Sequence, residues 1–175
     1  MLRILLEGNI ENALVFLFSA VVVVFIASPF HEFSHALVAY WLGDDTAKLQ
    51  GRLTLNPFAH IDWMGATFIL LFGYGFAKPV PINLNNLRYS KVGMKGGAVL
   101  TAFAGPLSNL IMATVSSFLM FTVIEFVPIN NYDVFVYVTY FFHYIIIINI
   151  SLAVFNLIPV PPLDGSKILF YAFVL

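Results

Sequence analysis

The sequence predicts an all-α polytopic membrane protein: a helix bundle with a short strand-like or re-entrant region between its first and second core helices. Hydrophobic residues make up 61% of the 175 residues and charged residues 10%, whereas soluble domains carry about 25% charged residues. The mean hydropathy is +0.93. Several apolar runs are long enough to cross a hydrocarbon core of about 30 Å. We therefore expect residues 1–175 to form one domain embedded in a lipid bilayer.

The net charge and the cysteine content limit the possible partners and metal ligands. A formal net charge of −1 argues against a nucleic-acid partner. The chain has no cysteine, which excludes disulfides and thiolate metal ligands. Any metal ion must therefore be bound by histidine, carboxylate or water.

The first core helix is predicted over residues 13–42. Its length of about 45 Å at 1.5 Å per residue exceeds the bilayer core, and Pro29 is expected to kink it. A signal peptide is not expected, because Glu7 and Glu11 interrupt the approach to the apolar run and no small-residue cleavage site follows. Gly43, Asp44 and Asp45 then end the helix.

This helix contains the sequence His31-Glu32-Phe33-Ser34-His35. Residues four apart on a helix lie on the same face, so His31 and His35 can bind one metal ion. Glu32, beside the first ligand, is then placed to take a proton from an activated water. Ionisable groups are costly inside a membrane, so three of them within five residues indicate a functional site.

An interfacial or re-entrant region is predicted over residues 44–95. Residues 48–57 alternate weakly in polarity and carry Gly and Pro, which favours short strands or an extended loop. Such a strand could pair its edge with an extended substrate. Residues 61–77 are apolar but short and rich in glycine, and are therefore marginal for a span.

Three further core helices are predicted over residues 96–127, 134–158 and 164–175. The loops 44–60 and 78–95 carry lysine and arginine, whereas the turn 128–133 carries none. The positive-inside rule places both basic loops on the cytoplasmic side, which requires 61–77 to return to the side it left. The end of the 134–158 helix and the residues after it then reach the membrane level of His31 and His35.

A catalytic zinc usually has three protein ligands and one open position. The candidates for the third ligand are His60, Asp62, Asp133, His143 and Asp164. Asp133 and His143 lie towards the outer side, and His60 and Asp62 lie in a stretch where solvated side chains are common. Asp164 is favoured because a carboxylate at the start of an apolar helix needs a partner.

Two motifs carry a resemblance to a known family. The first is His31–His35, and the second is Asn156-Leu157-Ile158-Pro159 with Leu163-Asp164-Gly165. Together they resemble the site-2 protease family of intramembrane zinc metalloproteases, in its compact prokaryotic branch. The likeness extends over residues 13–170 and includes Gly51–Asp62 and Ala104–Asn109.

This resemblance implies a set of roles. His31, His35 and Asp164 would bind one Zn²⁺ per chain, and Glu32 would be the general base. Asn156 would orient the substrate backbone or stabilise the oxyanion, and Asn109 is a second candidate for that task. The substrate would be a transmembrane segment of another protein, cut near the cytoplasmic side of the cell membrane.

Two other functions stay open at the level of sequence. The same ligands could serve a non-proteolytic membrane metal carrier or sensor, or the chain could be a catalytically silent binder of membrane segments. Hydrolysis requires a base such as Glu32 and metal transport does not, so the intact motif favours the protease. The oligomeric state cannot be read from the sequence.

Overall fold

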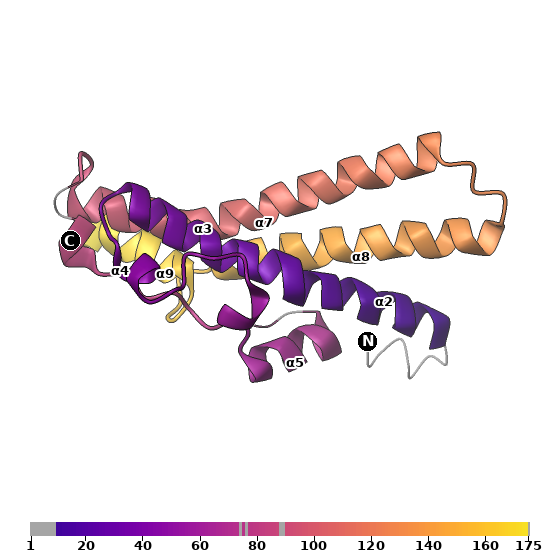
Figure 1. Cartoon of the computed structure of the whole chain (residues 1–175), viewed down its shortest axis with the longest axis horizontal. Coiled ribbons are helices and arrows are strands. Elements are labelled where there is room, and N and C mark those ends of the chain that lie inside the picture. Colours follow the sequence, from indigo (N-terminus) through magenta and orange to yellow (C-terminus); the bar gives the residue numbers. More distant parts are fainter. Residues whose placement is uncertain (1–9, 74, 76, 88–89, 175) are drawn as a thin grey trace.

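Helices make up the regular structure in a computed structural model of the chain, which describes residues 10–73, 75, 77–87 and 90–174. Among these residues three helices are long and apolar enough to cross a membrane. The first combines α2, a π-helical turn η1 and α3, and the other two are α7 and α8 (Figure 1). Their bounds are Ile10–Val22 (α2), Val23–Ala27 (η1), Ser28–Trp41 (α3), Gly93–Phe126 (α7) and Tyr132–Asn156 (α8).

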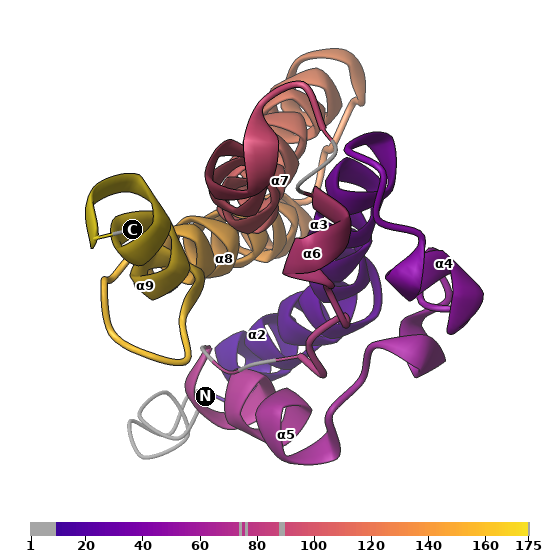
Figure 2. The same cartoon turned by 90° about the vertical axis from the view of Figure 1, so that its left-hand side faces the viewer.

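The first long helix crosses a hairpin made by the other two. Its first half, α2, packs on α8, and its second half, α3, packs on α7. In the view along the bundle, α9 lies beside α7 and α8 at the end that α3 also reaches (Figure 2). The main apolar cluster joins α2, η1, α5 and α8 and contains Phe16, Val23, Ile69, Ile148 and Leu152. The predicted helical membrane bundle is therefore confirmed.

A π-helical turn precedes Pro29 in the first helix. The Ser28 N–H donates to the Val23 carbonyl, five residues back, instead of the usual four. Proline has no N–H to donate and its ring crowds the preceding turn, and π-turns are a common way to accommodate such an interruption. The irregularity expected at Pro29 thus takes the form of a wider turn immediately before the His31–His35 motif.

Short helices occupy the region between α3 and α7. They are α4 (Thr46–Leu49), the 3₁₀ turn η2 (Pro57–Ala59), α5 (Trp63–Phe72) and α6 (Leu84–Leu87). Ten residues make α5 about 15 Å long, half the thickness of a hydrocarbon core, so α5 cannot span a bilayer. It ends at Gly73, whose φ of 83° is the left-handed conformation that glycine adopts without a steric penalty.

The strand-like region predicted between the first core helices is wrong, because no residue in the described ranges forms a β-strand. The backbone here bonds locally instead. The Arg52 N–H donates to Ala47 after a turn at Gly51, whose φ is 68°, and the Asn56 side chain caps η2 by accepting the Phe58 N–H. A strand needs a paired neighbour, and these Gly and Asn-Pro turns leave too short a run to form one. Without a strand, residues 49–55 cannot offer an edge for pairing with an extended substrate, so that expectation is also wrong.

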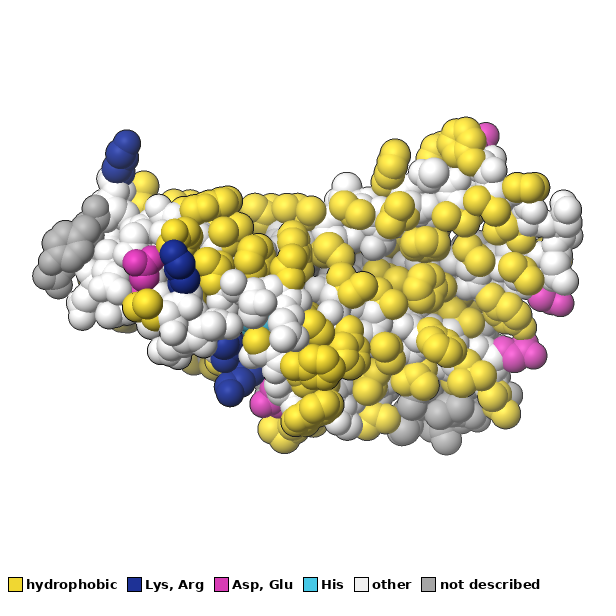
Figure 3. Space-filling model, in the orientation of Figure 1, with side chains coloured by type: hydrophobic (Ala, Val, Ile, Leu, Met, Phe, Trp, Pro, Cys, Tyr) yellow, Lys and Arg dark blue, Asp and Glu magenta, His cyan; other side chains and the backbone are white. Residues whose placement is uncertain are grey.

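The chain continues from α8 through a proline-containing loop to α9 (Asp164–Leu169) and a π-helical end η3 (Phe170–Val174). Both pack on α7. The opening residues 1–9, with Arg3 and Glu7, and Leu175 at the end lie outside the described residues. Apolar side chains cover most of the face shown in Figure 3, where basic side chains lie only towards the α3 end and acidic ones lie at both ends.

Ser19 joins α2 to α8 and generates a stability prediction. Its fully buried hydroxyl contacts the Val15 carbonyl at 2.8 Å and the Phe141 carbonyl of α8 at 3.0 Å. Small residues at membrane helix contacts let the backbones approach closely. Ser19→Leu should therefore separate the helices and lower the free energy of unfolding by about 1–3 kcal/mol, measured by denaturant titration in lipid or detergent. Val21→Leu, at a more exposed position of α2, is the control, and equal stability of both variants would contradict the packing.

Candidate metal centre

The helix α3 presents His31, Glu32 and His35 to the interior of the bundle. All three side chains are buried. The two imidazole rings stand one turn apart with their centroids 4.7 Å from each other, and their Nε2 atoms are 3.1 Å apart. Two ring nitrogens at this distance inside an apolar bundle point to a shared partner between them.

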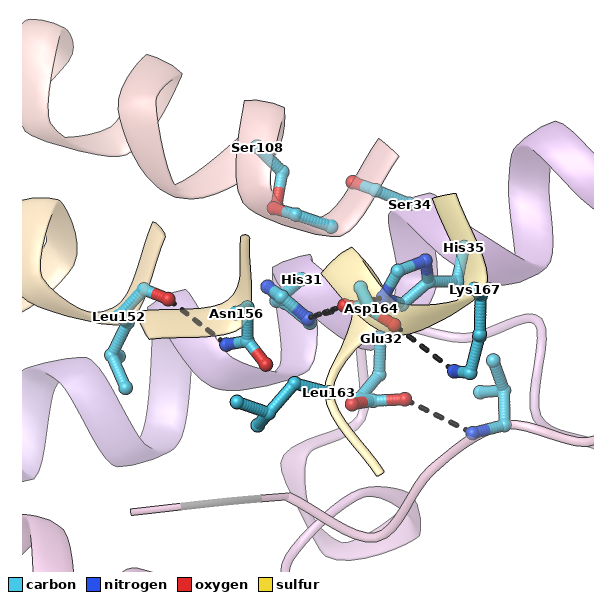
Figure 4. Close-up of polar contacts among 12 residues, drawn as sticks. His31, Glu32, Ser34, His35, Ser108, Leu152, Asn156, Leu163, Asp164 and Lys167 are labelled. Carbon is cyan, nitrogen blue, oxygen red and sulfur yellow. Dashed lines mark hydrogen bonds and ion pairs between the residues drawn. The ribbon is translucent and has the colours of Figure 1, made fainter. Parts of the chain in front are cut away.

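Asp164 completes the group from the far end of the chain. Its Oδ2 lies 3.4 Å from His31 Nε2 and 3.1 Å from His35 Nε2, as Figure 4 shows. Its other oxygen, Oδ1, accepts a hydrogen bond from Lys167 Nζ at 3.0 Å, one turn along α9. Lys167 therefore holds one carboxylate oxygen while the second faces the imidazoles.

The donor set fits zinc. Zinc bonds to histidine nitrogen and carboxylate oxygen are about 2.0–2.1 Å long, so two ligands of a tetrahedral ion lie roughly 3.3 Å apart. The observed separations of 3.1, 3.1 and 3.4 Å bracket this value. His31, His35 and Asp164 form a group of donors able to hold a metal ion among the described residues, and they leave a fourth position open, as catalytic zinc sites do.

The neighbouring helix α7 orients one imidazole and makes room for both. The Thr101 carbonyl lies 2.7 Å from His35 Nδ1, so this nitrogen donates and Nε2 is left to bind metal. One turn further along α7 stands Gly105. A Cβ there would lie 2.3 Å from His35 Nε2 and 2.5 Å from His31 Nε2, and glycine is therefore required at this position.

Close packing between the start of α9 and the end of α8 fixes the position of Asp164. Gly165 sits so close to the end of α8 that a Cβ on it would lie 2.2 Å from the Leu157 carbonyl oxygen. The absence of a side chain lets α9 begin directly beside the last turn of α8. The Asp-Gly pair of the second motif thus combines a ligand with the close packing that places it.

Glu32 lies beside the donors without joining them. Its Oε2 accepts the Val80 N–H at 3.0 Å. It lines a cavity of about 190 Å³ together with His31, His35 and Asp164. A carboxylate next to a three-ligand metal site, with access to the same cavity, has the placement that a general base requires.

The two candidate asparagines reach the same cavity from different helices. Asn109 of α7 is buried, and its Oδ1 has no hydrogen-bond partner among the residues that the structure describes. Asn156, at the end of α8, donates from Nδ2 to the Leu152 carbonyl at 3.0 Å. Both line the cavity, and the structure therefore brings every predicted site residue to one place.

The other four candidates for the third ligand lie elsewhere. His60 is buried and bonds through Nε2 to the Thr54 carbonyl at 2.8 Å. Burial lowers the pKa of His60, although the Thr54 carbonyl acts in the opposite direction. Asp62 caps α5 by accepting the Gly65 N–H. Asp133 begins α8 at the opposite end of the bundle, and His143 is exposed on the side of that helix.

Sequence reasoning missed four contacts around the site. The spacing of Lys167 three residues after Asp164 on a helix could have revealed their ion pair. The backbone groups of Thr101 and Val80 leave no such signal, because every residue type carries a carbonyl and all but proline carry an N–H. Gly105 lies within the likeness at Ala104–Asn109, but the sequence does not show that its missing side chain makes room for the imidazoles. Only the three-dimensional arrangement assigns these groups to the site.

Gly105→Ala should abolish stoichiometric zinc binding, because the added methyl group would occupy space needed by both imidazole nitrogens. Metal analysis of the purified protein after dialysis against buffered zinc measures the effect. Gly96→Ala on the same helix is the matched control, since its Cβ would meet only the Val92 side chain, at 3.1 Å. Full zinc occupancy in Gly105→Ala would contradict the assigned geometry.

Comparison with known proteins agrees with the zinc site that the geometry indicates. A family profile described as "Peptidase family M50" matches residues 122–174. "Putative zinc metalloprotease YwhC" of Bacillus subtilis (strain 168) is 42% identical over 155 residues, which are 85% of this chain and 66%, just under two thirds, of that protein. No solved structure matches significantly. The profile match and this identity link the chain to peptidase family M50, that of the site-2 proteases, as its motifs indicated.

Proposed function

We propose that this protein is an intramembrane zinc metallopeptidase that hydrolyses peptide bonds in or near transmembrane segments of other proteins. The observation that carries this proposal is the convergence of two imidazoles and one carboxylate on a single point, beside a glutamate that lines the same cavity. A match to a peptidase family profile and similarity to a protein named a zinc metalloprotease support it.

His31, His35 and Asp164 would hold one Zn²⁺ per chain, which when bound would acidify a water molecule and polarise the substrate carbonyl. Glu32 takes the proton that the attacking water loses. It then delivers that proton to the leaving amine, so that one water is added across the broken C–N bond. The Val80 N–H on Oε2 leaves Oε1 of Glu32 available for both transfers.

The cavity constrains how a substrate is presented. At about 190 Å³ it is smaller than the roughly 300–1,000 Å³ of common ligand pockets, and an α-helix with its side chains is about 10–12 Å wide. A helical substrate must therefore unwind locally before its carbonyl reaches the site. Unwinding frees backbone groups that need new partners inside the membrane, and Asn109 and Asn156 offer amides for this purpose.

Charge supports a cytoplasmic position for the site. The described lysines and arginine lie in the segments at the same end as the metal centre, namely Lys48, Arg52, Lys78, Lys91, Lys95 and Lys167, with Arg3 and Arg88 outside the described residues. The opposite end carries Glu11, Glu125 and Asp133 instead. The positive-inside rule then orients the metal centre towards the cytoplasm, where the path for water is short.

Glu32→Gln should reduce cleavage of single-span substrates by about 10²- to 10⁴-fold, the usual contribution of a general base, while zinc stays bound. The assay compares both proteins in liposomes containing a panel of substrates, with and without a chelator, alongside metal analysis. Cleavage that survives the substitution would contradict the mechanism. Wild-type protein that binds zinc but cleaves no substrate would favour a metal carrier or sensor, and binding of substrate without zinc would favour a silent binder.

Asn109→Ala and Asn156→Ala should each lower kcat/KM by about 10- to 100-fold, because each removes an amide that can bond to the unwound substrate. Bound zinc should be unchanged. Asn149→Ala is the control, since Asn149 is as buried as Asn109 and bonds its own helix at Ile145, as Asn156 does at Leu152, but does not line the cavity. Equal activity of all three variants would remove the asparagines from the mechanism.

A further inference from the structure

The segment 77–83, which we call the bridging segment, passes over Glu32 on its way from α5 to α6. Its central residue, Val80, donates its N–H to Glu32 Oε2 at 3.0 Å. The Val80 side chain is buried in a small apolar cluster with Ala36 and Ala47. Ala36 follows Glu32 by one helical turn, so both contacts seat the bridging segment on the part of α3 that carries the catalytic motif.

The first end of the bridging segment is held by the loop that follows α4. The Lys78 N–H donates to the His60 carbonyl at 2.8 Å. Arg52 Nη2 donates to the Lys78 carbonyl at 2.6 Å and lies 3.3 Å from the Pro79 carbonyl. These bonds fix the backbone immediately before Val80.

The second end is held by Asp44, whose side chain is 0% exposed. One oxygen accepts the Asn83 N–H at 2.7 Å. The other accepts Asn86 Nδ2 at 2.8 Å and the Thr46 N–H at 3.1 Å, and it also accepts the Thr46 hydroxyl. Burial raises the pKa of Asp44, but the hydrogen bonds from Thr46, Asn83 and Asn86 outweigh burial and hold the pKa below its ordinary value.

The acceptor pattern of Asp44 goes beyond ending a helix. A residue that only stops α3 needs bonds to its immediate neighbours, as Asp62 makes at the start of α5. Asp44 bonds in addition to two residues about forty positions away, Asn83 at the far end of the bridging segment and Asn86 in α6, which follows it. A buried carboxylate that binds several donors is costly to form unless all of them are in place, so it specifies one position for that segment.

We propose that Asp44 is a positioning residue for Glu32. It fixes the bridging segment so that the Val80 N–H holds Oε2 of Glu32 and directs the other carboxylate oxygen to the reacting water. Figure 4 shows the bond between Glu32 and the segment beneath it. The inference rests on the proposed function of Glu32 as general base. It assigns to the loop region the positioning of Glu32, a role distinct from metal binding and from substrate binding.

Asp44→Asn tests this role, because the amide keeps the size of the side chain but turns one acceptor oxygen into a donor. We expect kcat to fall by about 10- to 100-fold, as when a catalytic group is displaced slightly, with KM and bound zinc unchanged. Asp45→Asn is the matched control: it makes the same change of charge at the next residue, which is exposed.

Hydrogen exchange supplies a readout that does not depend on catalysis. In the inactive Glu32→Gln protein, whose amide oxygen can still accept the Val80 N–H, Asp44→Asn should accelerate exchange of a peptide covering residues 77–83, and Asp45→Asn should not. Wild-type protein without chelator-sensitive cleavage would overturn the proposed function. Normal kcat in Asp44→Asn with an active wild type would overturn the positioning role alone.

Val80→Pro provides a second test if Asp44→Asn folds poorly. Proline removes the N–H at the contact itself and leaves Asp44 in place, whereas Val80→Ala keeps the N–H and is the control. Val80→Pro should lower kcat as Asp44→Asn does, and the double variant should lose no more than either alone, because both act through one bond. Normal kcat in Val80→Pro, or additive losses in the double variant, would overturn the proposal.

Discussion

The structure depends on the burial of two imidazoles and a carboxylate within 3.1–3.4 Å of one another, inside a bundle whose main core cluster is apolar. Polar groups in such an interior are costly unless they are paired or bind a metal. Each surrounding element reduces that cost in a different way. Gly105 of α7 provides the space, Thr101 orients one ring, and Lys167 holds the second oxygen of Asp164. The similarity of the chain to a protein named a zinc metalloprotease fits this arrangement of donors.

The proposed catalytic residues are positioned partly by rigid helices and partly by a loop whose ends are held by hydrogen bonds. The proposed metal ligands stand on α3 and α9, where helix packing determines their positions. Glu32 also stands on α3, but its carboxylate is held by the bridging segment, whose ends are bound by Arg52 and Asp44. In this proposal the loop region supports the base and also connects two membrane spans. This division explains why so polar a stretch lies against the metal centre.

The long helices and the ligands could be predicted from the sequence because both leave strong local signals. Apolar length identifies the three spans, and the asymmetry of charge between the loops places Asp164 at the membrane level of His31. The loop region could not be predicted, since its weak alternation suggested strands whereas local turns at Gly51 and Asn56 satisfy the backbone. Contacts made by backbone groups, such as Val80 to Glu32, have no residue signature. Nor does the sequence show that Asp44 bonds to residues about forty positions further along the chain.

The most direct test of the account is the X-ray absorption spectrum of protein loaded with one equivalent of zinc. The account predicts nitrogen and oxygen ligands at about 2.0–2.1 Å, with the outer-shell scattering of two imidazoles, and loss of this spectrum in Asp164→Ala. A spectrum with one imidazole or none, or one that Asp164→Ala leaves unchanged, would place the metal elsewhere and contradict the account.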